Sequence, residues 1–315
     1  MSTLSYADIK AAADRIAGRV RPVTVAPGDP EGPSLALEFL QHTGTFKARG
    51  AQNFLLAHRE AGTLPDTGVA LASGGNAGLA NAWAAGRLGV PATVFLPETA
   101  PPVKIARLRG YGAEVRLAGR EYAEAAAACA EFADRTGALR SHAYDHPLIA
   151  AGAGTLVDEI LAACPSGGPD TLVVSVGGGG LFAGVATAAR HHGIRTVAVE
   201  PEHCRALNAA LEAGEAVDVP VDSVAADSLG ARRATPLALE AARASGARSV
   251  LVPDAAIVRA RRALWDECRV AVEHAAAAAL AGLSSGAYVP ADGERVTVVL
   301  CGANTDPTDL AGPAS

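Results

Sequence analysis

The sequence predicts an α/β fold with two open, mostly parallel twisted sheets that carry helices on both faces. Short apolar segments alternate with turns and longer helical patterns along much of the chain, and this rhythm is typical of parallel β–α–β units. The segment 171–176 is almost entirely apolar, as expected for a strand that a parallel sheet buries on both faces. The length of 315 residues is sufficient for two domains.

Residues 1–55 are predicted to begin a large domain. An amphipathic helix is expected over 6–16, and an irregular stretch rich in proline and glycine follows over 21–33. A strand is expected over 35–40, and a turn leads from this strand into a helix over 49–60.

A small domain is predicted over 56–145, because three strand–helix pairs follow one another there. Its strands are expected at 69–72, 92–96 and 114–117, and its helices at 79–88, 101–110 and 122–136. The large domain is predicted to resume over 146–315. Its strands are expected at 171–176, 196–200, 249–252 and 296–300, and its helices at 151–163, 181–191, 205–213, 236–244, 255–270 and 272–283. The tail from Asp306 onward is expected to be disordered.

Composition and charge exclude several classes of function. The net charge is −6 and the basic residues are scattered, so nothing favours a nucleic-acid partner. No apolar run reaches the length of a membrane span, and the first residues lack the pattern of a secretory signal. The five cysteines show neither a CxxC pair nor a spacing with histidine that suits zinc. A reduced, cytoplasmic protein without a membrane partner is therefore expected.

The stretch TGTFKARG (43–50) contains Lys47, one of only three lysines, whereas arginine supplies the other basic residues. Arginine stays protonated in proteins, but a buried lysine can lose its proton and act as a nucleophile. The retained lysine therefore indicates an amine used for covalent chemistry. The alternative is an exposed lysine at the start of a helix.

Four consecutive glycines, Gly177 to Gly180, follow the buried strand and open a helix. Such a turn lets backbone N–H groups surround an anion, and the helix N-terminus adds its dipole, so a phosphate site is predicted. One alternative is a dinucleotide site, in which Glu200 would be the acidic residue about 20 positions further on. The other is a purely structural turn, but the sequence offers no packing reason for the entropic cost of four glycines.

Two further stretches follow predicted strands. The turn SGGNAG (73–78) offers a hydroxyl, an amide and backbone N–H groups that could hold a carboxylate or a phenolic oxygen; a capped, glycine-rich turn is the alternative. Cys301 follows the last strand, at the edge where α/β sheets bind ligands, although a buried structural cysteine is the commoner case. An amine, a phosphate cradle and a carboxylate site together are what pyridoxal phosphate requires.

With these motifs the chain resembles the fold-type II pyridoxal-phosphate enzymes, which share the architecture of the tryptophan synthase β subunit. It is most similar to the serine/threonine dehydratases and their close relative serine racemase. The resemblance covers nearly the whole chain, and the motifs occur in family order. The matching stretches are TGTFKARGA (43–51), ASGGNAG (72–78), VPATVFLPETAPPVKIARLRGYGAEV (90–115), HAYDHPLIAAGAGT (142–155), VVSVGGGGLFAG (173–184), AVEP (198–201) and VVLCGAN (298–304).

The resemblance implies a role for each matching residue. Lys47 would form the Schiff base with the cofactor and later take the α-proton, and Ser73 would join it in catalysis. Glu200 matches a carboxylate that binds a monovalent or divalent cation in the family; its alternative is a strand-end carboxylate in an ion pair. The implied cofactor-binding residues are Lys47, Phe46, Asn76, Gly177, Gly178, Gly179, Gly180, Leu181, Glu273 and Cys301. The implied substrate-binding residues are Ser73, Gly74, Asn76 and Ala77.

The activity that the resemblance implies is β-elimination from L-serine and/or L-threonine, which gives pyruvate or 2-oxobutyrate and ammonia. A 3-hydroxyaspartate dehydratase is an alternative, with Arg120 reaching the second carboxylate. Serine racemase is another, but its second acid/base serine is replaced by Gly74 here. A nicotinamide-dependent oxidoreductase is a remote alternative. A homodimer is expected by analogy, and a catabolic role is expected because no effector domain follows Cys301.

Overall fold

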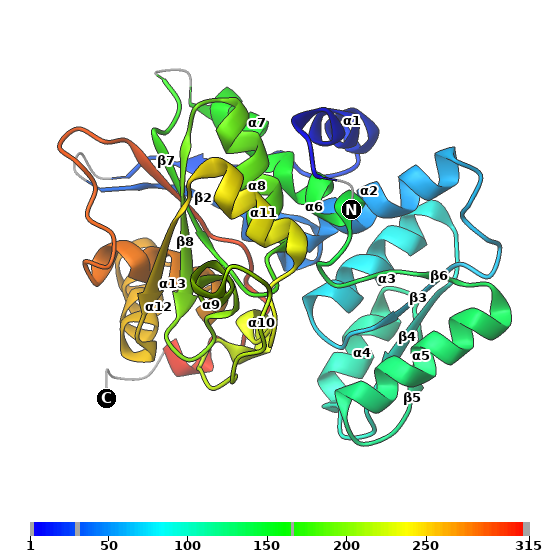
Figure 1. Ribbon diagram of the computed structural model, residues 1–315. Coiled ribbons are helices and arrows are strands. Elements are labelled where there is room, and N and C mark those ends of the chain that lie inside the picture. The colour runs from blue at the N-terminus through cyan, green and yellow to red at the C-terminus, as the bar shows by residue number, and fades with distance from the viewer. Residues whose placement is uncertain (1–2, 29–31, 165–166, 311–315) are drawn as a thin grey trace.

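The computed structural model describes residues 3–28, 32–164 and 167–310, and it shows two sheets that lie side by side with helices around them (Figure 1). This architecture confirms the predicted α/β class. The helices are α1 (Tyr6–Ile16), α2 (Lys47–Glu60), α3 (Asn76–Leu88), α4 (Pro102–Gly110), α5 (Tyr122–Thr136), α6 (Pro147–Gly154), α7 (Leu156–Ala163), α8 (Gly180–His191), α9 (Ala206–Ala213), α10 (Ala226–Leu229), α11 (Pro236–Ser245), α12 (Asp254–Cys268) and α13 (His274–Ser284). None of the helices in the described ranges is long and apolar enough to cross a membrane.

The larger sheet has the strand order β1-β2-β10-β7-β8-β9. Every neighbouring pair is parallel except β1 and β2, which are antiparallel. Helices α8 and α13 pack on opposite faces of this sheet, and every residue of β7 is buried, as predicted for a central parallel strand (Figure 1). The strands are β1 (Val25–Ala26), β2 (Ser34–Ala36), β7 (Thr171–Ser175), β8 (Arg195–Pro201), β9 (Arg248–Val252) and β10 (Val296–Val299).

The smaller sheet has the order β5-β4-β3-β6, with all neighbours parallel. Side chains alternate across it, so Val94 packs on the α3 side and Phe95 on the α5 side. The predicted domain boundary after residue 55 falls inside α2, whose Phe54 and Leu55 are buried in the same apolar cluster as the α3 side of this sheet. The strands are β3 (Val69–Ala72), β4 (Ala92–Leu96), β5 (Glu114–Leu117) and β6 (Leu139–Arg140).

Helix α6 lies between α2 and α8, with a glycine at each crossing. A Cβ atom on Gly152 would lie 2.7 Å from the carbonyl oxygen of Arg49 in α2, and one on Gly154 would lie 2.7 Å from that of Gly184 in α8. These distances leave no room for side chains, so the helix backbones are in direct contact. Because α2 begins at Lys47 and α8 begins at Gly180, this packing fixes the distance between two predicted functional segments.

Three predictions about local structure were wrong in part. The predicted strand over 35–40 ends at Ala36, and a 3₁₀ turn (Glu38–Leu40) follows because Glu38 points inward to a buried arginine. The predicted helix over 151–163 is two helices, α6 and α7, and α6 already begins at Pro147. Residues 306–310 are ordered, since Asp309 pairs with Arg261; the rest of the predicted disordered tail lies outside the described residues.

Candidate active site

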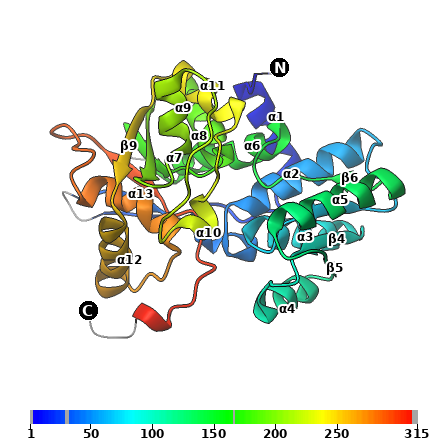
Figure 2. The same cartoon turned by 60° about the horizontal axis from the view of Figure 1, so that its bottom comes forward.

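A cavity of about 520 Å³ opens between the two sheets, close to α10, which lies where the two groups of elements meet (Figure 2). It contains the residues that follow β3, β7 and β10, because the carboxyl ends of parallel strands are where α/β sheets place ligands. All predicted cofactor- and substrate-binding residues line this one cavity. They are Phe46, Lys47, Ser73, Gly74, Asn76, Ala77, Gly177, Gly178, Gly179, Gly180, Leu181, Glu273 and Cys301.

Lys47 is the first residue of α2, so its side chain stands at the positive end of the helix dipole. Its Nζ donates a hydrogen bond to the carbonyl oxygen of Ala143 at 3.0 Å and lies 4.9 Å from the centre of the Phe46 ring. Burial lowers the pKa of Lys47 to about 8, although the nearby Cys301 and Glu273 oppose this shift. An amine with this pKa is partly neutral near pH 7 and can act as a nucleophile or base.

The glycine turn packs tightly against neighbouring segments and also presents unpaired backbone N–H groups. A Cβ atom on Gly178 would overlap the ring of Tyr144, and Gly179 has φ +97° and packs against Ala238. These contacts are a packing reason for glycine that the sequence did not reveal. The backbone N–H groups from Gly177 to Leu181 donate to no acceptor within the described residues. Five free donors at the start of α8 form a cradle that suits a phosphate.

The second turn presents a similar surface at the start of α3. The Ser73 hydroxyl makes no hydrogen bond to the described part of the chain, and the N–H groups from Gly74 to Gly78 donate to no acceptor there. A Cβ atom on Gly74 would lie 2.8 Å from Cδ2 of Leu96, the flexible end of a side chain. The turn can therefore hold a carboxylate through one hydroxyl and several amides.

Glu273 connects segments that are far apart in the sequence. Its carboxylate accepts hydrogen bonds from Asn76 Nδ2 at 2.9 and 3.0 Å, from Ser228 Oγ at 2.8 Å and from the backbone N–H of Asn304 at 2.8 Å. Asn76 belongs to α3 beside the smaller sheet, whereas Ser228 belongs to α10 and Asn304 follows β10 of the larger sheet. Glu273 is thus held rigidly at the cavity wall and links the two groups of elements.

Asn304 contacts two residues of the cavity wall, Asn76 and Glu273, although the sequence assigned it no role beyond ending the matching stretch VVLCGAN. Its Nδ2 donates to Asn76 Oδ1 and to the carbonyl oxygen of Thr43, both at 2.7 Å, and its Oδ1 accepts from Arg107 of α4. It therefore joins α3, α4 and the loop that precedes Lys47. Only its position after a strand end hinted at this.

Cys301 lies two residues after β10, with Sγ 3.6 Å from the Ser175 hydroxyl. Burial raises the pKa of the Cys301 thiol to about 12, and the negative charge of Glu273 adds to the rise. The side chain is therefore a neutral thiol over the whole physiological pH range. It can accept or donate a weak hydrogen bond, but it does not supply a negative charge.

Glu200 and Arg120, for which the sequence suggests functional roles, lie outside this cavity. Glu200 is fully buried, and its carboxylate accepts hydrogen bonds from the N–H groups of Leu207 and Asn208 at 2.7 Å, so it caps α9. Burial raises the pKa of Glu200 to about 8. The described residues contain no group of three or more metal-binding side chains. Arg120 is exposed at the start of α5, where its N–H bonds to Glu124.

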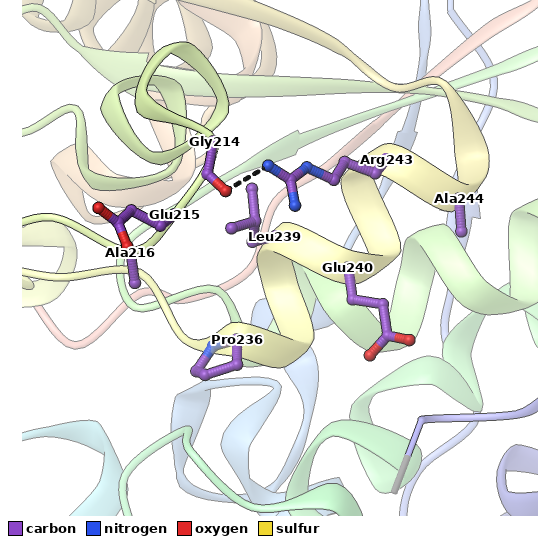
Figure 3. A pocket seen from close by; sticks show the side chains of 8 residues that line it. All are labelled: Gly214, Glu215, Ala216, Pro236, Leu239, Glu240, Arg243 and Ala244. Carbon is purple, nitrogen blue, oxygen red and sulfur yellow. Dashed lines mark hydrogen bonds between the residues drawn. The ribbon is translucent and has the colours of Figure 1, made fainter. Parts of the chain in front are cut away.

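Another hollow, of about 680 Å³, lies beside α11 (Figure 3). Figure 3 shows Arg243 donating to the carbonyl oxygen of Gly214 across it, at 2.6 Å. Its lining contains no lysine, cysteine, serine or histidine. It therefore lacks an amine, a thiol and a buried cluster of backbone donors like those around Lys47, and the cavity around Lys47 is the candidate active site.

Comparisons with known proteins agree with this choice. A family described as pyridoxal-phosphate dependent enzyme matches residues 34–302. An L-threonine ammonia-lyase of Geobacter sulfurreducens is 38% identical over 96% of this chain and 76% of the relative. A human serine dehydratase-like protein is 38% identical over 86% of this chain and 84% of the relative. The structure of maize serine racemase superposes with a TM-score of 0.90 at 28% identity, covering 98% of this chain and 96% of that one.

Proposed function

This chain belongs to the pyridoxal-phosphate dependent enzyme family, and on that premise we propose that it removes the β-hydroxyl and amino groups of L-serine and/or L-threonine. The products would be pyruvate or 2-oxobutyrate and ammonia. The observation that carries the proposal is the buried amine of Lys47 in the same cavity as two clusters of free backbone donors. Membership of this family also contradicts the alternative of a nicotinamide-dependent oxidoreductase.

The residues of the cavity fit the cofactor. The free N–H groups from Gly177 to Leu181 would hold its phosphate, and Phe46 would lie against one face of its ring. Asn76 would contact the ring 3′-oxygen, while Glu273 and Cys301 would flank the ring. When bound, pyridoxal phosphate supplies an aldehyde for covalent attachment to an amine and a conjugated ring that stabilises negative charge on the α-carbon.

We assign the proton transfers to Lys47. Its neutral Nζ would take the α-proton of the substrate, and its pKa near 8 makes it a usable base close to neutral pH. Ser73 and the amides of Asn76 and Ala77 would hold the substrate carboxylate, so that the α-proton faces Lys47. The neutral Cys301 thiol would not hold the ring nitrogen protonated, which favours prompt loss of the β-hydroxyl over racemisation. Over the whole reaction the substrate loses one water molecule. A second water molecule then displaces the nitrogen as ammonia and leaves the 2-oxo acid.

The test is an assay of 2-oxo acid formation by the purified, cofactor-loaded protein. The substrates would be L-serine, L-threonine, D-serine and threo-3-hydroxyaspartate. Product from L-serine or L-threonine is the expected result. A product from 3-hydroxyaspartate alone would replace the substrate assignment, and no product from any of the four would overturn the elimination.

The attachment of the cofactor to Lys47 should depend on pH. Only the neutral amine attacks an aldehyde, so the rate should rise about tenfold per pH unit below 8 and level off above it. The measurement is the absorbance change after pyridoxal phosphate is added to cofactor-free protein between pH 6 and 10. A rate that keeps rising to the usual lysine pKa would show that burial does not lower the pKa of Lys47.

Replacing Gly74 with serine should raise the racemisation of serine. The new hydroxyl would lie where serine racemase carries its second acid/base group, provided that Leu96 moves to admit the Cβ atom. D-serine formation would be measured by chiral chromatography, with Gly74→Ala as the control for bulk alone. If neither variant forms more D-serine than the parent, the residue at position 74 does not decide between elimination and racemisation.

The remaining expectations belong to the same proposal. We place the large domain at residues 1–55 and 146–315 and the small domain at 56–145, which agrees with the strand content of the two sheets. We also propose a cytoplasmic homodimer and a cation near Glu200. Sedimentation would test the dimer, and activity in potassium compared with tetramethylammonium salts would test the cation.

A further inference from the structure

A separate cavity of about 320 Å³ lies where the loop after α1, the middle of α2 and the last turn of α3 meet. Its lining residues are Ala17, Gly18, Arg19, Gln52 and Arg87. None of them lines the active-site cavity. Small-molecule sites commonly have volumes of about 300–1,000 Å³, so a small ligand fits here.

The charge of this cavity is positive and uncompensated. Two guanidinium groups line it and no carboxylate does. Arg19 and Arg87 make no side-chain hydrogen bond or ion pair within the described ranges, whereas Arg15 of the neighbouring α1 is bound to Glu60 and Asn53. A pair of free arginines facing one cavity is an arrangement that suits an oxyanion, because guanidinium groups bind phosphate and carboxylate with two parallel hydrogen bonds.

The positive charge of Arg87 also acts on a neighbouring histidine, His42. His42 stacks on Trp83 of α3, with ring centres 4.5 Å apart. Burial lowers the pKa of His42, and the charges of Arg21 and Arg87 lower it further. The region around Arg87 therefore already disfavours an additional cation.

Gln52 supplies an independent sign of a missing partner. Its side chain is 1% exposed and lines the cavity, yet its Oε1 has no hydrogen-bond donor among the described residues. A buried amide oxygen without a donor is unfavourable, and such groups in native proteins call for an explanation. A ligand that carries an O–H group next to its negative charge would satisfy Gln52 and the two arginines together.

We propose that this cavity is a second binding site, which takes a small phosphate-type oxyanion. Arg19 and Arg87 neutralise the anion from two sides. Gln52 Oε1 is itself buried, so the amide turns about its last side-chain bond to accept the O–H group of monohydrogen phosphate. A simple carboxylate such as acetate offers the charge but no donor. The site is independent of the reaction assigned to the active-site cavity, since its evidence comes from other residues.

Calorimetric titration of the cofactor-loaded protein with inorganic phosphate tests the proposal, because the bound cofactor already fills the glycine cradle. We expect one phosphate per chain, with at least tenfold weaker binding in Arg19→Gln and in Arg87→Gln. Arg109→Gln is the matched control, since Arg109 is likewise an exposed arginine in the last turn of a helix. It should bind phosphate as the parent does. Acetate at equal ionic strength should bind at least tenfold more weakly than phosphate.

Three results would overturn the site. The first is no phosphate binding by the parent protein, and the second is equal binding by the parent and both arginine variants. The third is acetate binding as tight as that of phosphate, which would remove the role of Gln52. Gln52→Leu adds a readout that separates binding from folding. It should weaken phosphate binding without lowering the melting temperature in phosphate-free buffer, and a lower melting temperature with unchanged binding would assign Gln52 a structural role only.

Discussion

Replacing Lys47 with alanine is expected to lower the rate of 2-oxo acid formation by about 10⁴-fold or more. The variant loses the amine that we assign to covalent attachment and to removal of the α-proton, and a well-placed acid or base alone contributes about 10²–10⁴-fold. The cradle from Gly177 to Leu181 remains, so cofactor should still bind, but without covalent attachment. The measurements are steady-state kinetics and mass spectrometry of the protein after borohydride reduction.

The chain offers a matched control in Lys10. This lysine lies on the surface, with its Nζ 4.0 Å from Oδ2 of Asp158. Lys10→Ala should retain the parent rate and should still carry one cofactor per chain after reduction. Appreciable 2-oxo acid formation by Lys47→Ala would remove Lys47 from the mechanism. Cofactor attached covalently to that variant would show that another amine carries it.

Replacing Arg49 with methionine is expected to destabilise the fold by about 3–5 kcal/mol, the usual result of leaving a buried charge without its partner. Arg49 is fully buried, and its guanidinium binds Glu38 at 2.6 and 3.0 Å and Glu159 at 2.8 and 2.7 Å. Burial alone would lower the pKa of Arg49, but the two carboxylates raise it, so the guanidinium stays charged. The measurement is urea unfolding of the parent and the variant.

The loss should depend on pH in a defined direction. Burial raises the pKa of Glu38 and Arg49 opposes the rise, so in Arg49→Met the pKa of Glu38 should increase further. A group whose folded pKa is raised contributes stability below its unfolded pKa, and this contribution is lost as the pH rises through the folded pKa. The variant should therefore be closest to the parent near pH 4.5 and furthest from it at pH 8.

A double variant separates the lost ion pair from lost packing. Arg49→Met with Glu38→Gln should recover part of the stability that Arg49→Met loses, because no bare carboxylate remains buried. If the double variant is less stable than Arg49→Met at pH 8, the unpaired charge of Glu38 is not the cause.

The fold was largely predictable because its signals are local. Apolar strands such as Thr171–Ser175 and the turns that follow them are contiguous in the sequence, so their periodicity and glycines identify them. That these turns line one cavity could be predicted for the same reason. Strand ends of a parallel sheet meet at one edge, so residues that follow different strands converge.

The remaining features depend on contacts between distant segments. The inward turn of Glu38 exists because Arg49, eleven residues later, is buried beneath it. The role of Asn304 depends on Thr43, Asn76 and Arg107, which no local pattern relates to it. Position 178 requires glycine because the ring of Tyr144 packs against it, and Tyr144 follows β6 of the smaller sheet. Neither periodicity nor a motif encodes such long-range pairs.

The packing of α6 has a consequence for which ligands the enzyme accepts. Because α6 touches α2 and α8 through glycines, no side chain can rotate to change the separation between Lys47 and the phosphate cradle. The three helices therefore hold Lys47 and the glycine cradle at a fixed separation. A ligand must have the matching length to contact both of them. A cofactor analogue with one more carbon between ring and phosphate would contact one of them and miss the other. Selection by molecular length thus resides in the helix backbones, away from any group that touches the ring.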